Sequence, residues 1–381
     1  MRRTALVGAD IFDGEARHHG HALLLAGDTI EALVPEASLD PSIERVALGG
    51  GLLVPGFIDI QVNGGGGALL NDTPTVEGVR AICAAHARFG STALLPTVIT
   101  DRPAVTFAAI AAVEAAIAAG VPGCLGIHVE GPFLSVARKG AHDPALIRVM
   151  GEDDLQALIA TTVRPLLLTV APESVSPEQI SRLTSAGITV SLGHTDTDFD
   201  TANAAFDAGA RCVTHLFNAM SQLGHRTPGL VGAALERPEV WCGIIADGHH
   251  VHPAAIGIAL RAKRGPGRLM AITDAMPTVG IHDDVFVLSS RTVTRHGGRL
   301  TFDDGTLAGS DLSMISAVHY LTRTIGLELE EALRMAATYP AEFLGLGRTH
   351  GRLGSGARAD IVHLDAATEI AGVWIGGTRS V

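Results

Sequence analysis

The sequence has few aromatic residues and few lysines, and each scarcity narrows the possible functions. Phe, Tyr and Trp together make up 4% of the 381 residues, which is few for the stacking surfaces that bind nucleic acid. Lys139 and Lys263 are the only lysines, so almost all positive charge is guanidinium. Asp and Glu (40) exceed Lys and Arg (28), giving a formal net charge of −12. We therefore expect no nucleic-acid partner, and an anionic ligand would need a local basic group.

Cysteines are also scarce, and long apolar segments are absent. The four cysteines are far apart and form no C-x-x-C pair, which favours buried free thiols over disulfides or structural zinc. The N-terminus has no sustained apolar region, and no run of about 20 apolar residues lacks a charge. These features predict a cytoplasmic, soluble protein with no membrane partner.

From Leu53 onward, apolar runs typical of buried strands alternate with Ala-rich segments typical of amphipathic helices. The strand-like runs are LLVPGFIDIQV, TALLPTVIT, GCLGIHVEGPF, PLLLTVAPE, ITVSLGH, CVTHLFN, WCGIIADG and RLMAITDA. The intervening helices are expected at 76–89, 104–119, 153–161, 177–186, 199–208 and 253–261. Eight such units are the number that closes a barrel, so we predict an α/β fold, a (β/α)8 TIM-type barrel over residues 54–345.

Both ends of the chain read differently. Residues 1–53 and 346–381 contain short strand-like runs broken by Gly and Asp, and we expect them to pair into one small β-sandwich domain. After the eighth strand, GGRLTFDDGTLAGS reads as a strand and turn, and helices are expected at 314–325 and 328–344.

The strand-like runs end in polar residues, which a barrel brings together at one mouth. Glu130, His194 and His215 end the third, fifth and sixth runs. Two imidazoles and one carboxylate can hold a divalent metal ion and leave a position open for water, which is a catalytic pattern. Each residue alone could equally be a hydrogen-bonded strand end, but three near-adjacent strand ends favour the metal site.

Four further positions are candidates for the chemistry. Asp274 ends the eighth run and could act as general base and acid, although an Asp that caps a turn is the alternative. His142 could polarise a carbonyl, or be a solvent-exposed loop histidine. Arg226 could bind a phosphate bidentately, or lie on the surface. The run ADGHHVH could indicate a second metal site, but we favour one hydrogen-bonding histidine, His250, with exposed neighbours.

These motifs together resemble one family over nearly the whole chain. The segments VPGFIDIQVNGGGG, HVEGPFL, KGAHDP, SLGHTD, THLFNAMS, ADGHHVH, AITDAM and GTLAGS, in this order, resemble the N-acetylglucosamine-6-phosphate deacetylases, the NagA type within the amidohydrolase superfamily. The resemblance implies a barrel with a β-sandwich built from both chain ends, and it implies hydrolysis of N-acetyl-D-glucosamine 6-phosphate to D-glucosamine 6-phosphate and acetate.

The resemblance also implies roles for individual residues. Glu130, His194 and His215 would bind the metal, usually zinc, while Asp274 would activate water and His142 would polarise the acetyl carbonyl. Arg226 would reach the phosphate of a neighbouring subunit in a homodimer. The other residues that would contact the substrate are Ala141, Asn218, Ala219, His250, Leu307, Ala308 and Gly309.

One departure from the wider superfamily affects the metal count. Many amidohydrolases have His-x-His after the first strand, whereas this chain has Gln61 and Asn63, which are poor ligands for a second zinc ion. We therefore expect one divalent ion, Zn²⁺, per subunit. A bridging carboxylated lysine is excluded, because neither lysine ends the fourth strand.

Two alternatives to this function stay open. The first keeps the chemistry but changes the sugar, for example to N-acetylgalactosamine 6-phosphate, since the configuration of one hydroxyl is invisible in the sequence. The second, from another class, is a non-catalytic amidohydrolase-like scaffold. A scaffold should have lost a metal ligand or the base, and this chain retains all four residues.

Overall fold

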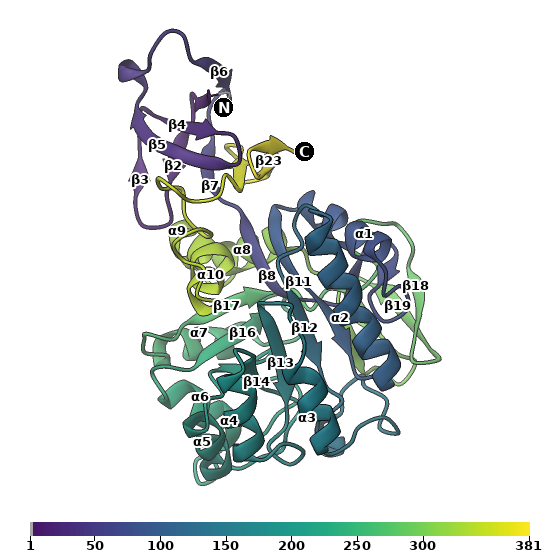
Figure 1. Ribbon diagram of the computed structural model, residues 1–381. Coiled ribbons are helices and arrows are strands. Elements are labelled where there is room, and N and C mark those ends of the chain that lie inside the picture. The colour runs from purple at the N-terminus through teal and green to yellow at the C-terminus, as the bar shows by residue number, and fades with distance from the viewer. Residues whose placement is uncertain (1–2) are drawn as a thin grey trace.

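The structure is a computed structural model that describes residues 3–381. A barrel of parallel strands forms most of the molecule, and a smaller β unit containing both chain ends lies against it (Figure 1). The eight barrel strands are adjacent in chain order, which confirms the predicted fold. They are β8 (Phe57–Val62), β11 (Ser91–Ile99), β12 (Ile127–Glu130), β13 (Leu166–Val170), β14 (Thr189–Leu192), β15 (Cys212–Val213), β16 (Trp241–Ile245) and β17 (Leu269–Ile272).

Helices cover the outside of the barrel. They are α1 (Val76–Ala87), α2 (Pro103–Ala118), α3 (Glu152–Ile159), α4 (Pro177–Ser185), α5 (Phe199–Asp207), α6 (Gly229–Glu236), α7 (Pro253–Ala262) and α8 (Met314–Arg323). Helix α6 is not among the helices expected from the sequence. Pro228 and Gly229 indicate a loop, and the apolar helix that begins there is short. A single apolar cluster links the strands and these helices, so the barrel has one continuous core.

The seam between β17 and β8 is closed by a few specific contacts. Val62 and Ala275 form an isolated parallel bridge, and Asp274 N donates to Gln61 O at 2.9 Å. Below this bridge, the buried Asp59 accepts a 2.5 Å hydrogen bond from the Thr273 hydroxyl. The two ends of the barrel sequence are thereby joined at the level where the strands finish, which positions the residues after β17 over the mouth.

The chain ends form two sheets. One has the order β5 (Thr29–Pro35), β4 (His21–Ala26), β1 (Arg3–Val7), β6 (Glu44–Ala47), and the other β24 (Thr378–Arg379), β23 (Ile370–Ile375), β22 (Ile361–Leu364), β7 (Leu52–Pro55), β2 (Asp10–Phe12), β3 (Arg17–His18). The second sheet joins the two ends through the antiparallel pair β7–β22. Leu23 and Ile30 from one sheet share an apolar cluster with Ile361 and Trp374 from the other. The predicted pairing of the two ends is confirmed, whereas the boundaries 1–53, 54–345 and 346–381 stay predictions.

The structure refines three local expectations. The first run, LLVPGFIDIQV, is two strands, because at Gly56 the chain leaves the terminal sheet (β7) and enters the barrel (β8). The helix expected at 328–344 is present from Leu329 to Phe343, but it is not regular: α9 (Leu329–Leu333) and α10 (Tyr339–Phe343) are joined by a π-helical turn, η3 (Arg334–Thr338). The π turn precedes Pro340, which has no N–H to donate.

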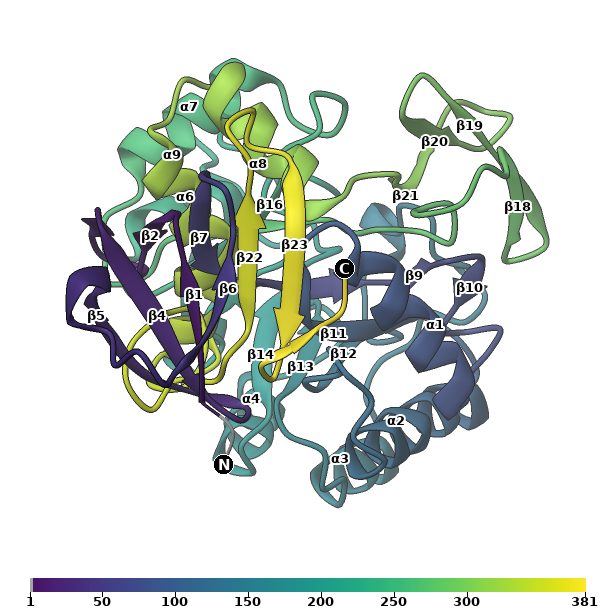
Figure 2. The same cartoon turned by 90° about the horizontal axis from the view of Figure 1, so that it is seen from above.

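The third correction concerns the segment after β17. Instead of one strand and a turn, it forms a four-stranded antiparallel sheet, β18 (Val285–Leu288), β19 (Arg291–His296), β20 (Arg299–Thr301) and β21 (Leu307–Ser310). This sheet, which we call the arm, projects from the barrel on the side away from the terminal strands (Figure 2). An isolated bridge between Ala275 and Ser310 anchors its last strand beside the end of β17.

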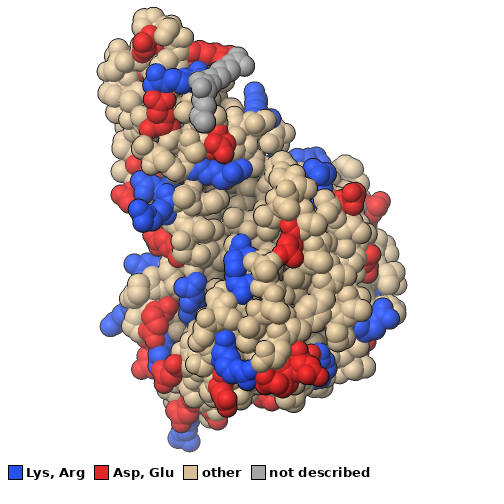
Figure 3. Space-filling model, viewed as in Figure 1, with Lys and Arg blue, Asp and Glu red and all other residues tan. Residues whose placement is uncertain are grey.

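The surface is mixed in charge. On the face shown in Figure 3, basic and acidic side chains are interspersed over the barrel helices and the terminal sheets. No helix among residues 3–381 is long and apolar enough to cross a membrane.

Candidate active site

Glu130, His194 and His215 meet at the barrel mouth, as the sequence predicts. The Oε1 atom of Glu130 lies 3.2 Å from His194 Nε2 and 3.1 Å from His215 Nε2, and the two Nε2 atoms are 3.0 Å apart. All three residues are buried. A tetrahedral zinc ion with bonds of about 2.0–2.1 Å would separate its ligand atoms by about 3.3 Å. The three donor atoms therefore fit a small divalent ion, and together they could hold one.

The tautomer of His194 supports this interpretation. Its Nδ1 atom lies 2.9 Å from the backbone carbonyl of Arg138, and because a carbonyl only accepts, Nδ1 carries the proton. The lone pair of His194 is consequently on Nε2, which faces Glu130 and His215. Metal-binding histidines are commonly oriented by such a contact. His215 differs, since its buried Nδ1 atom has no hydrogen-bond partner among residues 3–381.

Backbone strain accumulates around the same residues. His194, His215 and Asp274 have φ values of 49°, 35° and 54°, and Ala219 has 48°. A non-glycine residue in this left-handed region costs roughly 1–3 kcal/mol and persists only where surrounding contacts determine it. The strand ends thus turn sharply just as they leave the barrel, which directs their side chains into the mouth.

The two carboxylates of the site are in different electrostatic states. Burial raises the pKa of Glu130, but hydrogen bonds and charge from His194 and His215 outweigh burial and hold it well below its usual value. Burial raises the pKa of Asp274, and the negative charge of Glu130 raises it further. Glu130 is therefore suited to hold a cation, whereas Asp274 has a stronger tendency than an ordinary Asp to take up a proton.

His142 reaches the site from the loop after β12. Thr100 holds its Nδ1 atom, through the hydroxyl at 2.8 Å and the backbone N–H at 3.4 Å. Because that N–H can only donate, Nδ1 accepts and Nε2 carries the proton. Burial, followed by the charge of His194, lowers the pKa of His142 to about 3. His142 is thus a neutral imidazole whose remaining N–H can donate to an oxygen.

Gly131 makes this contact possible. A Cβ atom at this position would lie 2.2 Å from the Thr100 hydroxyl oxygen, and the backbone has a φ of +88°. Only glycine lets Thr100 approach the chain after Glu130 and reach His142.

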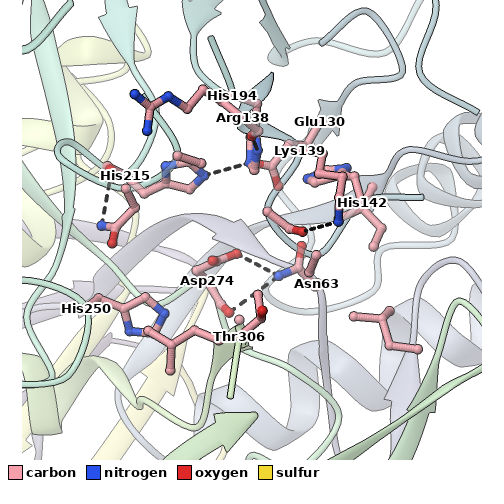
Figure 4. A pocket seen from close by; sticks show the side chains of 18 of the residues that line it. Asn63, Glu130, Arg138, Lys139, His142, His194, His215, His250, Asp274 and Thr306 are labelled. Carbon is pink, nitrogen blue, oxygen red and sulfur yellow. Dashed lines mark hydrogen bonds and ion pairs between the residues drawn. The ribbon is translucent and has the colours of Figure 1, made fainter. Parts of the chain in front are cut away.

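A cavity of about 500 Å³ opens over these residues. Figure 4 shows their side chains converging on it from several strand ends. The predicted residues that line it are Glu130, Ala141, His142, His194, His215, Asn218, Ala219, His250, Asp274, Leu307 and Gly309. Two predicted residues lie outside it. Ala308 is buried in the apolar cluster of the arm, and the exposed Arg226 lies beside a separate surface groove.

Several lining residues escaped the sequence-based prediction. Arg138, Lys139 and Thr306 line the cavity. Asp247, outside the lining, holds His250 by a 2.6 Å contact from Oδ2 to Nδ1. Asn63 also lines the cavity, whereas its sequence context indicates only a poor metal ligand. Position is the useful signal, because Asn63 and Asp247 lie within two residues of the end of a barrel strand, as the predicted metal-binding residues do.

Comparisons with known proteins identify the family of this chain. The amidohydrolase family matches residues 52–379 and the NagA composite domain matches residues 4–53. A relative from Shewanella sp. (strain ANA-3), an N-acetylgalactosamine-6-phosphate deacetylase, is 47% identical over 86% of this chain and 82% of its own length. The human N-acetylglucosamine-6-phosphate deacetylase is 39% identical over 88% of this chain and 84% of its own.

Solved structures give the same result. The N-acetylglucosamine-6-phosphate deacetylase of Pasteurella multocida superposes with a TM-score of 0.95, at 32% identity over 99% of both chains. A mutant of the Mycobacterium smegmatis enzyme in complex with N-acetyl-D-glucosamine 6-phosphate has a TM-score of 0.91, at 33% identity over the whole of both chains. With its barrel, its Glu/His/His cluster and these relatives, the chain belongs to the amidohydrolase family, as a member of the NagA type.

Proposed function

We propose that this protein is a metal-dependent deacetylase that hydrolyses N-acetyl-D-glucosamine 6-phosphate to D-glucosamine 6-phosphate and acetate. The observation that carries the proposal is the placement of Asp274 across one cavity from the Glu130–His194–His215 cluster. The relatives with this fold act, by their names, on N-acetylhexosamine 6-phosphates. A non-catalytic scaffold would have no reason to retain the base and all three metal-binding side chains.

The donor set favours one divalent ion per chain, and we propose Zn²⁺. Two imidazole nitrogens and one carboxylate oxygen are ligands typical of catalytic zinc, and they leave coordination positions open. When bound, the ion would act as a Lewis acid toward water and the acetyl carbonyl. Gln61 and Asn63 stand where a second ion would need histidines, which argues for a single ion.

Other side chains of the cavity transfer protons and stabilise the negative charge that develops during the reaction. Asp274 accepts a proton from the attacking water and later donates it to the departing sugar nitrogen. His142, with its proton on Nε2, donates a hydrogen bond to the acetyl oxygen as negative charge develops there. Asp247 fixes the proton of His250 on Nδ1, so that the other ring nitrogen is available to the sugar.

The remaining predicted contacts surround the sugar. Asn218 and Ala219 lie beyond the β15 end, while Leu307 and Gly309 approach from the arm. Ala141 belongs to the same lining, and Ala308 supports it from behind.

Arg226 requires a second copy of the chain to reach the phosphate, because it lies outside the cavity of its own chain. We therefore propose a homodimer in which Arg226 completes the partner's site. Mixing Arg226→Ala protein with His194→Ala protein tests this arrangement, since hybrid dimers should contain one site with both wild-type residues. Activity of the mixture no greater than the sum of the two variants would contradict a shared site.

Acetate release from a panel of sugars tests the main proposal. The panel contains N-acetylglucosamine and N-acetylgalactosamine, each with and without the 6-phosphate. Among these four, N-acetyl-D-glucosamine 6-phosphate should have the highest kcat/KM. Release of acetate from none of the four by metal-loaded protein would refute the proposal.

One observation favours a second substrate. The relative from Shewanella, at 47% identity, is an N-acetylgalactosamine-6-phosphate deacetylase, whereas the glucosamine-type relatives described above are 32–39% identical. The same panel decides between the two epimers, which differ only in the configuration of one sugar hydroxyl, because it contains both of them. A kcat/KM at least tenfold higher for the galacto sugar would assign that substrate instead.

We also propose that residues 1–53 and 346–381 form one domain and residues 54–345 the other, and that the protein acts in the cytoplasm. The apolar cluster shared by the two terminal sheets supports the first proposal. The relatives' small phosphorylated substrates support the second.

A further inference from the structure

Two buried amides, Gln61 and Asn63, occupy the end of β8 beside the proposed base. They are two residues apart, so a strand directs both side chains to the same side, here the barrel mouth. Gln61 is 1% exposed and Asn63 2%. Buried side-chain amides are costly unless they are hydrogen-bonded, so their partners indicate what they do.

Both amides donate to the same atom. Asp274 Oδ1 accepts from Asn63 Nδ2 at 2.7 Å and from Gln61 Nε2 at 3.1 Å. No donor among residues 3–381 holds the other oxygen, Oδ2. Figure 4 shows Asn63 and Asp274 joined in this way at the cavity. The two oxygens of the carboxylate are therefore not equivalent.

The orientation of Asn63 is determined by this contact. Its Oδ1 atom is buried and has no partner among the described residues. Turning the amide over would place that oxygen against the carboxylate oxygen of Asp274, which repels it. The side chain thus leaves one acceptor unsatisfied in order to donate to Asp274, a choice that packing alone does not explain.

The backbone holds the same pair in register. Asp274 N donates to Gln61 O at 2.9 Å and Asn63 N donates to Ala275 O at 2.9 Å. Gln61 Nε2 also lies 3.2 and 3.3 Å from the two oxygens of Glu130. Gln61 thus places an N–H group between two carboxylates that would otherwise repel each other.

We infer that Gln61 and Asn63 are positioning residues for the base: by occupying Oδ1 of Asp274, they leave Oδ2 as the oxygen that exchanges the proton. When the water oxygen bonds to the acetyl carbon, a water O–H bond breaks and that proton bonds to Oδ2. When the carbon–nitrogen bond breaks, the same proton passes from Oδ2 to the sugar nitrogen. This inference rests on the proposed deacetylase function, and the experiment below separates the two.

The test uses Asn63→Leu, because Gln61 also touches a proposed metal-binding residue and its loss would have mixed effects. Leucine has a similar size but no donor. Loss of a charge-assisted hydrogen bond to the base should lower kcat about ten- to a hundredfold. KM and metal content should stay within about threefold, because neither depends on which oxygen of Asp274 is free.

Asn71→Leu is the matched control. Asn71 is also an amide near the barrel mouth that donates to a carboxylate, Asp101 Oδ2 at 3.0 Å, and it binds the backbone of Ile99. It has no contact with Asp274, so kcat should change less than about threefold. A loss equal to that of Asn63→Leu would show that any amide in this region affects turnover, and the inference would fail.

Measuring Asn63→Leu in two backgrounds separates positioning of Asp274 from a merely structural role of Asn63. In an Asp274→Asn background, Asn63→Leu should have almost no further effect on residual kcat, because the group that it positions is gone. An equal fold-loss in both backgrounds would overturn the inference. If Asn63→Leu does not fold, Asn63→Ala is measured in the same way.

A crystal structure of the Asn63 variant distinguishes the inference from the proposed function. The Asp274 carboxylate should turn from its wild-type orientation once Oδ1 has lost its shortest contact. If wild-type protein releases no acetate from any sugar, the proposed function fails, yet this structure still tests the positioning. An Asp274 carboxylate that keeps its wild-type orientation would refute the inference.

Discussion

Replacing Asp274 with asparagine removes the proposed base while keeping its shape. The amide oxygen of the new side chain can still accept from Gln61 and Asn63, which lie 3.1 and 2.7 Å from Oδ1. The neutral side chain also removes the repulsion from Glu130 that helps to raise the pKa of Asp274. We therefore expect a melting temperature equal to or higher than that of the wild type, and unchanged metal content.

The expected loss of activity is large. A positioned general base contributes about 10²–10⁴ in rate, or roughly 3–5 kcal/mol of transition-state stabilisation. Asp274 would move a proton twice, so the loss should lie near the upper end and appear in kcat rather than KM. Acetate release, metal analysis and thermal unfolding on one preparation measure these quantities together. A folded, metal-loaded variant with near wild-type kcat would refute the mechanism, and a folded variant without metal would make Asp274 a ligand.

Three further predictions follow from the site and the core. Chelation should remove about one divalent ion per chain together with the activity, and His194→Ala should not reload; two ions that are both required would contradict the single site. Arg226→Ala should raise KM about ten- to hundredfold for a 6-phosphorylated sugar but leave the unphosphorylated analogue unchanged, and equal losses for both would exclude a phosphate contact. Burial lowers the pKa of His86 to about 4. As the pH falls, His86 is therefore protonated in the unfolded chain before it is protonated in the folded protein. The contribution of His86 to the free energy of unfolding should then be fully present above pH 6.5 and fall by about 3 kcal/mol toward pH 4. A His86→Gln variant whose free energy of unfolding depends on pH as in the wild type would contradict this.

The barrel and the Glu130–His194–His215 cluster could be predicted because both depend on local pattern. Each buried parallel strand is a short apolar run, and its polar end is visible in the sequence as the first interruption of that run. Closure of the barrel then brings those ends together, whatever their separation along the chain. Glu130, His194 and His215 were found in this way, without knowledge of any contact between them.

Elements whose limits depend on other parts of the chain could not be found in this way. In the run at 52–62, only Pro55 and Gly56 mark the division into two strands, because β7 and β8 are both buried throughout and continue the same strand-like pattern. Helix α6 is short, and Gly229 at its start has a φ of +59°, which is a loop signal in a sequence. The sequence predicts a strand and turn in the second half of the arm but not its first strand, β18. This strand exposes two valines, so its sequence lacks the polar–apolar alternation that marks a half-buried strand.

The geometry around Asp274 depends on the one junction of the barrel that no local pattern describes. Gln61 and Asp274 are separated by 213 residues and meet only because the last strand returns to the first. In the sequence, two amides in place of histidines indicate only that a second metal ion is disfavoured. In the closed barrel, the same two side chains donate hydrogen bonds to Asp274, the proposed base. A substitution that removes metal ligands from this position can therefore retain a role in catalysis, because amides can orient a carboxylate that histidines would share with a second ion.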